Sequence, residues 1–179
     1  MIPKKDSKQL LTESILELLS TNPLEKISIT DIVRNCGVSK RTFYNYYKDK
    51  YDLANSVYLY LVADYYSRHR EKISFRELLF YTAQCVMDHI DFFTNIISYQ
   101  GQNNFRLYVA DPLCELYVQL IEEQYAETLD PAHQKSLRFF VIGTVGFVEE
   151  RIATKDYIDP NEIVAFFELC CPAWMGKYF

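Results

Sequence analysis

Apolar residues along this chain recur with the spacing of helices rather than strands. From Ser7 onward, five apolar side chains fall on one stripe of an amphipathic helix. The helix is expected to end before Pro23, because a residue that precedes proline is disfavoured in the α region. Almost no segment alternates with period two for long, as a half-buried strand does, so the pattern predicts an all-α protein. The residues of this first stripe are Leu10, Leu11, Ile15, Leu18 and Leu19.

Two short helices follow, and their start and stop signals lie close together. The segment that begins at Ser28 reads "SITD", a capping box in which the serine accepts the amide hydrogen three residues later. The helix stops at Gly37, since glycine takes left-handed backbone angles cheaply, and Ser39 caps the next one. Two short helices joined by a glycine-containing turn predict a helix-turn-helix motif, supported by the Leu10–Leu19 helix.

The remainder of the chain predicts six more helices, which makes about nine in total. The first begins near Lys48-Asp49 and connects a module, residues 1–50, to a body, residues 51–179. We expect these two parts to be an N-terminal helix-turn-helix domain and a C-terminal helical domain. The other expected helices are Ser74–Phe93, Asn95–Val109, Pro112–Thr128, Pro131–Ala153 and Asn161–Met175, with breaks at Gly101, Asp111-Pro112, Asp130-Pro131 and Asp159-Pro160.

Composition and charge refine this picture. Hydrophobic residues make up 49% of the chain, which is typical of a globular protein. The net charge of −5 argues against a nucleic-acid-binding protein only while the two parts are pooled. The module holds nine Lys or Arg against six Asp or Glu, a net +3, and the body holds ten against eighteen, a net −8. The asymmetry indicates a cationic module on an acidic body.

The helix that follows Ser39, "SKRTFYNYYK", separates into two faces on a helical wheel. Phe43 and Tyr47 are four residues apart and share an apolar face. Cations near a helix N-terminus oppose the helix dipole, so the position of Arg41 is easier to understand if an anion lies in front of it. This part of a helix-turn-helix meets base edges in the major groove, where Arg suits guanine and Asn45 suits adenine.

The whole predicted DNA-binding surface combines base-reading and phosphate-binding residue types. A solvated Lys-rich face, with tyrosines that keep only their hydroxyls in water, is the alternative interpretation. The predicted residues are Ser28, Thr30, Ser39, Lys40, Arg41, Thr42, Tyr44, Asn45, Tyr46, Lys48 and Lys50.

Residues 28–53, "SITDIVRNCGVSKRTFYNYYKDKYDL", resemble the DNA-binding signature of the tetracycline-repressor (TetR) family of bacterial regulators. The chain departs from the family pattern at Val33 and Cys36, where Ala is common, at Arg41, where Gly is common, and at Tyr51, where Glu is common. The long cationic side chain of Arg41 leaves the target sequence open. The matching residues are Ser28, Ile32, Gly37, Val38, Ser39, Thr42, Tyr44, Lys50 and Leu53, with Tyr47 at the Phe position.

The resemblance implies a homodimeric transcriptional regulator, most often a repressor, that binds a pseudo-palindromic operator in double-stranded DNA. It also implies a C-terminal domain that dimerises and holds a site for a small-molecule or protein effector. The stretch "DHIDFFTNIISYQGQNNFRLYV" looks like a Gram-positive subgroup that includes regulators of dihydroxyacetone kinase operons. Some members of that subgroup are thought to be activators or to bind protein coregulators, so activation and coregulation stay as alternatives.

Two regions of the body carry further expectations. The segment "LRFFVIGTVGFVEERI" is apolar nearly all round, which indicates burial on both sides, either by a partner subunit or within one chain. The expected dimer interface, which pairs this segment with the last helix, comprises Phe139, Phe140, Gly143, Phe147, Ile163, Phe166, Phe167 and Cys170. The segment from Phe75 to Tyr117 is rich in aromatic residues and also contains polar side chains. This combination favours an effector pocket, and core packing is the alternative interpretation. The expected pocket residues are Phe80, Gln84, His89, Phe93, Tyr99, Gln102, Arg106 and Tyr117.

Several classes of function lack support in the residues. Five cysteines have no CxxC spacing, and His69, His89 and His133 have no ligand spacing, so we expect no metal and no cofactor. A redox or metal role for the Cys170-Cys171 pair is the minor alternative. We find no catalytic constellation, no membrane span and no signal peptide, which predicts a cytoplasmic protein that is not an enzyme. A helical small-molecule-binding protein or enzyme without a DNA role is the second hypothesis.

Overall fold

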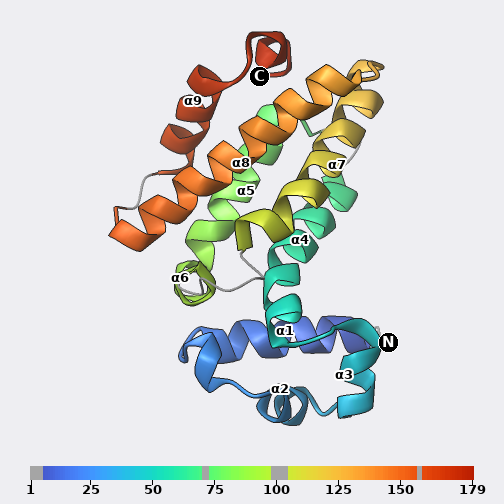
Figure 1. The fold of residues 1–179 in the computed structure, drawn as a ribbon, viewed down its shortest axis with the longest axis vertical. Coiled ribbons are helices and arrows are strands. Elements are labelled where there is room, and N and C mark those ends of the chain that lie inside the picture. The colour runs from blue at the N-terminus through green and yellow to red at the C-terminus, as the bar shows by residue number, and fades with distance from the viewer. Residues whose placement is uncertain (1–5, 70–72, 98–104, 157–158) are drawn as a thin grey trace.

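The computed structural model describes residues 6–69, 73–97, 105–156 and 159–179. Within these ranges the chain forms nine α-helices and two 3-10 helices and no strand, which confirms the all-α prediction. The module stands below the body, and α4 runs from one into the other (Figure 1). The module elements are α1 (Ser7–Leu19), η1 (Leu24–Lys26), α2 (Ile29–Cys36) and α3 (Lys40–Tyr46).

The body is a bundle of longer helices. Helix α7 packs along α8 and α4, while α5 packs along α9. Contacts of α6 and α4 with α1 join the body to the module. The body elements are α4 (Lys50–His69), α5 (Phe75–Asp88), α6 (Ile90–Ile97), α7 (Phe105–Tyr125), α8 (Pro131–Thr154), α9 (Pro160–Cys170) and η2 (Ala173–Tyr178).

Apolar stripes of three short helices make the core of the module. Leu11 and Ile15 of α1 pack with Ile32 of α2 and Phe43 of α3, and all four side chains are fully buried. Burial of a side chain of this size removes roughly 1.5–3 kcal/mol of unfavourable hydration. Leu11, Ile15 and Leu19 of the expected stripe therefore form the buried face of α1, against which the other two helices pack, while Leu10 and Leu18 are half-buried.

Two predicted boundaries in the body are wrong. The expected helix Ser74–Phe93 is divided at His89, whose backbone leaves the helical region between α5 and α6. The expected break at Pro112 is absent, because α7 continues through this residue. Leu113 and Val109 beside it are buried, and this packing outweighs the hydrogen bond that proline cannot donate. The expected break at Gly101 lies outside the described residues.

The end of the chain also differs from its prediction. Helix α9 stops at Cys170 instead of reaching Met175, and Pro172 precedes the 3-10 helix η2. Within η2, Met175 and Tyr178 are buried against the body. Among the described residues, no helix is both long enough and apolar enough to span a membrane.

Candidate nucleic-acid interface

Two side-chain caps and one glycine turn set the geometry of α2 and α3. The hydroxyl oxygen of Ser28 accepts a hydrogen bond from the Asp31 amide at 3.2 Å, and the Asp31 carboxylate accepts one from the Ser28 amide at 3.0 Å. The Ser28 hydroxyl also donates to the Asp31 carboxylate, and this bond together with the one from the Ser28 amide lowers the pKa of Asp31. Gly37 ends α2 with φ 73°, in the left-handed region. Ser39 then caps α3 by accepting from the Thr42 amide at 3.0 Å, so local bonds fix where the second helix begins.

The two faces of α3 have different chemistry. Phe43 is fully buried and lies edge-on to Tyr44, with ring centroids 5.4 Å apart. Tyr47, at the end of the helix, is buried beside Phe43. On the opposite side, Tyr44 is 58% exposed and Tyr46 is 49% exposed. The exposed face consists of Lys40, Arg41, Tyr44, Asn45, Tyr46 and Lys48.

The exposed face of α3 carries positive charge without internal compensation. Neither Lys40 nor Arg41 has an ion-pair partner among the residues that the structure describes. Helix α3 contains no acidic residue. The positive end of the helix dipole therefore adds to two free cations. This arrangement suits a polyanion, and the two exposed tyrosine rings add surfaces that can contact sugars and bases.

Four further predicted residues lie in the first turns or at the N-caps of α2 and α3. The hydroxyls of Ser28, Ser39 and Thr42 participate in the caps described above. Thr30 is half-buried in the first turn of α2. These side chains lie at the starts of the two helices, where backbone amides point outward. The hydroxyls of Ser28 and Ser39 thus fix where α2 and α3 begin.

The structure places Lys50 away from the exposed face of α3. Its ammonium group donates to the carbonyl oxygens of Leu24 at 2.7 Å, Glu25 at 3.1 Å and Ile27 at 2.8 Å. Burial lowers the pKa of Lys50. All three donors of this ammonium are consumed, so the side chain connects the start of α4 to η1. The prediction that it binds phosphate has no support from this geometry.

Arg34 is a cation of the module that the sequence pattern did not single out. It is exposed in the last turn of α2, one turn away from the Asp31 cap. Arg34 lies outside α3, and an arginine near a helix C-terminus is stabilised by the helix dipole whether or not it contacts another molecule. Its place in the sequence therefore gave no signal of a binding role. Arg34 extends the positive surface of the module onto α2.

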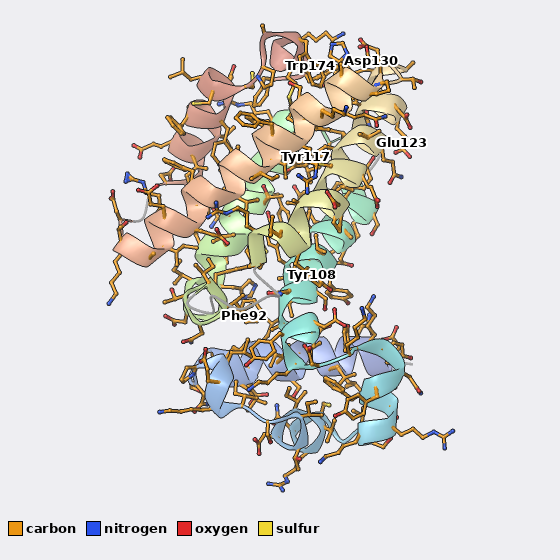
Figure 2. The ribbon with its side chains drawn as sticks, in the orientation of Figure 1. Phe92, Tyr108, Tyr117, Glu123, Asp130 and Trp174 are labelled. Atoms are coloured by element: carbon orange, nitrogen blue, oxygen red, sulfur yellow. The ribbon has the colours of Figure 1, made fainter. Side chains whose placement is uncertain are left out.

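The expected effector-pocket residues do not all meet. Phe93 and Tyr117 line a cavity of about 40 Å³ inside the body together with Tyr58 and Phe105, and Figure 2 shows Tyr117 within the helical bundle. Arg106 lies outside this cavity and pairs with Glu149 at 2.6 Å. Phe80, Gln84 and His89 do not line it. Tyr99 and Gln102 lie outside the described residues.

The expected dimer residues divide into a buried and an exposed set. Phe140, Ile163 and Phe167 are buried within the chain. Phe139 is 82% exposed, and a groove of about 510 Å³ runs between α8 and α9 beside it. Leu169 of α9 is 81% exposed. The other predicted residues that line this groove are Phe140 and Phe167 of the buried set, together with Gly143, Phe147, Phe166 and Cys170.

Metal and disulfide chemistry have no visible support in the described part of the chain. No group of three or more His, Cys, Asp or Glu residues there could hold a metal ion. All five cysteines are free thiols. Burial raises the pKa of the Cys85 thiol to about 12 and that of Cys114 to about 11, so both stay protonated and unreactive at neutral pH.

Comparisons with known proteins agree with this geometry. Residues 11–57 match the family model for "Bacterial regulatory proteins, tetR family". No curated protein matches the sequence. Among solved structures, the dihydroxyacetone kinase operon activator DhaS superposes with a TM-score of 0.65 at 14% identity, covering 96% of this chain and 97% of that one.

Two further structures share the fold. A TetR transcriptional regulator from Rhodococcus sp. RHA1 has a TM-score of 0.64 at 15% identity, covering 92% of this chain and 96% of that one. The TetR family repressor AlkX from Dietzia sp. Strain DQ12-45-1b has a TM-score of 0.61 at 12% identity, covering 97% of both chains. At these identities the likeness shows a common fold for module and body.

Proposed function

We propose, from the premise that the module is a DNA-binding domain of the TetR family, that this chain is a homodimeric transcriptional regulator. The division into a DNA-binding domain, residues 1–50, and a regulatory and dimerisation domain, residues 51–179, is part of the proposal. The observation that carries it is the exposed, uncompensated cationic face at the start of α3. In a helix-turn-helix this part of the second helix enters the major groove.

The side chains on that face have distinct proposed roles. Arg41 has the donor geometry for the O6 and N7 atoms of guanine, and Asn45 has the donor and acceptor pair for adenine. Lys40 and Lys48 flank them and neutralise phosphates. The ring of Tyr44 lies exposed next to these residues and can contact a thymine methyl group.

A second copy of the chain would complete the operator-binding unit. The groove between α8 and α9 leaves Phe139 in water, and Leu169 of α9 is also exposed. Exposed apolar side chains of this kind favour a protein partner. We infer that a partner subunit covers it with the same surface, which gives twofold symmetry. Two recognition helices would then read the half-sites of a pseudo-palindromic operator.

The body is the proposed site of regulation. Its internal cavity of about 40 Å³ is apolar except for hydroxyls and the edge of Glu149, and a ligand must enlarge it to enter. A small molecule or a protein coregulator that favours one arrangement of the two modules would change DNA affinity. Repression is the proposed output; the activator named among the structures of the same fold supports activation as the alternative.

Selection of genomic fragments followed by binding measurements tests the proposal. The wild-type protein should bind a selected duplex with an affinity that falls steeply as salt rises. Arg41→Ala should weaken the selected site by about 5- to 150-fold and random DNA far less. Lys135→Ala removes an exposed cation on α8 of the body and should leave both affinities unchanged. Absence of duplex binding at low salt would overturn the proposal.

The dimer is tested separately by its mass in solution. Phe139→Asp places a charge in the exposed apolar groove and should convert dimers to monomers, because a desolvated carboxylate without a partner is costly. Glu122→Asp, on the exposed surface of α7, should leave the mass unchanged. A wild-type chain that sediments as a monomer at micromolar concentration would contradict the homodimer.

A further inference from the structure

We infer that Tyr108 and Asp52 form a link that positions the recognition helix from the body, an inference that rests on the proposed DNA-binding function. The Tyr108 hydroxyl of α7 donates to Oδ1 of Asp52 at 2.9 Å. Oδ2 of the same carboxylate accepts from the backbone amide of Lys48 at 3.0 Å. One carboxylate thus joins a body helix to the segment between α3 and α4. Figure 2 shows Tyr108 where α7 passes the start of α4, beside the module.

The Lys48 amide is a sensitive place for such a link. Helix α3 ends at Tyr46, two residues earlier, and α4 begins at Lys50, two residues later. Asp49 caps α4 by accepting from the Asp52 amide at 2.8 Å, so Asp52 is itself held at the first turn of α4. The hydrogen bond from the Lys48 amide to the Asp52 carboxylate therefore fixes the angle between α3 and α4. The exposed residues of α3 turn with it.

The surroundings of Tyr108 keep its hydroxyl protonated and able to donate a hydrogen bond. The side chain is half-buried, and burial together with the neighbouring Asp52 carboxylate raises the pKa of Tyr108 above its ordinary value. The hydroxyl consequently stays protonated and remains a donor over the whole physiological range. A hydrogen bond to a charged acceptor in such a setting is stronger than one between neutral groups.

The same two helices form walls of the internal cavity. Phe105 lies one turn before Tyr108 on α7, and Tyr58 lies on α4 beyond Asp52; their rings are 5.6 Å apart, and both line the cavity. A ligand larger than the present space of about 40 Å³ must separate some of these walls. Separation of α7 from α4 stretches the bond between Tyr108 and Asp52. The link thereby gives the body a route to the orientation of α3.

A matched pair of variants isolates the link. Tyr108→Phe removes only the hydroxyl that reaches Asp52. Tyr66→Phe removes a hydroxyl that donates to Glu123 at 2.8 Å, a bond between the same two helices at their other end. Figure 2 shows Glu123 far along α7 from Tyr108. Both variants lose one tyrosine-to-carboxylate hydrogen bond, so their difference reports position.

The first readout is amide hydrogen exchange without DNA. Loss of one net hydrogen bond changes an equilibrium by roughly threefold to tenfold, so Tyr108→Phe should speed exchange across residues 47–49 by that factor. Tyr66→Phe should leave this segment at the wild-type rate. Equal exchange in all three proteins would overturn the link. This measurement decides about the link even if the wild type fails to bind DNA, which would overturn only the proposed function.

The second readout is the ratio of affinities for the selected operator and random DNA. Tyr108→Phe should lower this ratio about threefold to tenfold with an unchanged salt slope, and Tyr66→Phe should not change it. A positioning residue alters specific binding through orientation, whereas loss of fold lowers the unfolding temperature as well. An unchanged or raised ratio for Tyr108→Phe would contradict the inference.

Variants of Asp52 complete a double-mutant cycle. Asp52→Ala should lower the operator ratio at least as much as Tyr108→Phe, and the double variant should be no worse than Asp52→Ala alone. Asp52→Asn can accept from the Lys48 amide and donate to the Tyr108 oxygen, so it should restore most of the ratio. Additive losses in the double variant, or no rescue by Asn, would show that the two residues act separately.

Discussion

The module and the body of this chain expose opposite kinds of surface. The module presents free cations and tyrosine hydroxyls around α3, over a core of fully buried side chains such as Ile32 and Phe43. The body carries the acidic excess and leaves the large apolar side chains of Phe139 and Leu169 in water. A surface of the first kind attracts a polyanion, and one of the second kind attracts another protein surface. The contrast supports the proposal that the two regions bind different kinds of partner.

The largest expected effect tests whether the module can unfold while the body stays folded. Phe43→Ala removes a fully buried ring from the module core and should cost about 3–5 kcal/mol of unfolding free energy. Residue-resolved hydrogen exchange should show α1–α3 opening while α7 and α8 stay protected, and operator binding should be lost. Phe93→Ala, equally buried in the body, should have the reverse pattern. Simultaneous opening of all helices in Phe43→Ala would show that the two regions unfold as one unit.

A smaller effect compares the proline inside α7 with the proline at the start of α8. Pro112 lies exposed inside α7 and cannot donate the hydrogen bond of its turn, so Pro112→Ala should raise the unfolding free energy by about 1–3 kcal/mol. Pro131 occupies the first position of α8, where proline is favourable. Pro131→Ala should give no gain. Urea unfolding of both variants measures the difference, and a gain of the same size at Pro131 would refute the explanation.

Opposite pH trends should distinguish an acid of the body from one of the module. Burial raises the pKa of Glu149, although Arg106 acts in the other direction. Between the ordinary Glu pKa and this raised pKa, the folded state holds a proton that the unfolded chain has released. The free energy of unfolding therefore falls as the pH rises from the ordinary pKa to the raised one. The advantage of wild type over Glu149→Gln should shrink between pH 4.5 and pH 7 in urea unfolding.

The module acid has the reverse sign. Bonds from Ser28 lower the pKa of Asp31, so its stabilising contribution is present above the ordinary Asp pKa and is lost as the pH falls through the folded value. The advantage of wild type over Asp31→Asn should therefore grow as the pH rises from 3 to 6. Trends of the same sign for both acids would show that these environments have been misread.

The smallest expected effects compare one motif in both regions. Ser28 and Ser74 each form a capping box, with Asp31 and Glu77 as the reciprocal partners. Substitution of either serine by alanine should lower the unfolding temperature by about 2–4 °C. Only Ser28→Ala should also weaken operator binding, because Ser28 caps α2, which packs against α3. Equal DNA affinities for the two variants would remove this role.

Prediction from sequence succeeded where the determining contacts are local. The caps at Ser28 and Ser39 involve partners three residues away, so a short window of sequence contains all of the relevant chemistry. The buried and exposed faces of α3 follow from helical periodicity in the same way. The division of the long predicted helix at His89 and the continuity of α7 through Pro112 were missed, since the packing of neighbouring helices decides both.

The helical class, the helix-turn-helix in the module and the cationic face of α3 all follow from local sequence patterns. The tertiary structure determines the contacts between helices that are far apart in the sequence. It directed Lys50 to carbonyl groups 23 to 26 residues away in the chain and joined Tyr108 to Asp52 across 56 residues. Periodicity and capping depend on residues within one or two helical turns. Contacts across such separations depend instead on how whole helices pack, which no local pattern specifies.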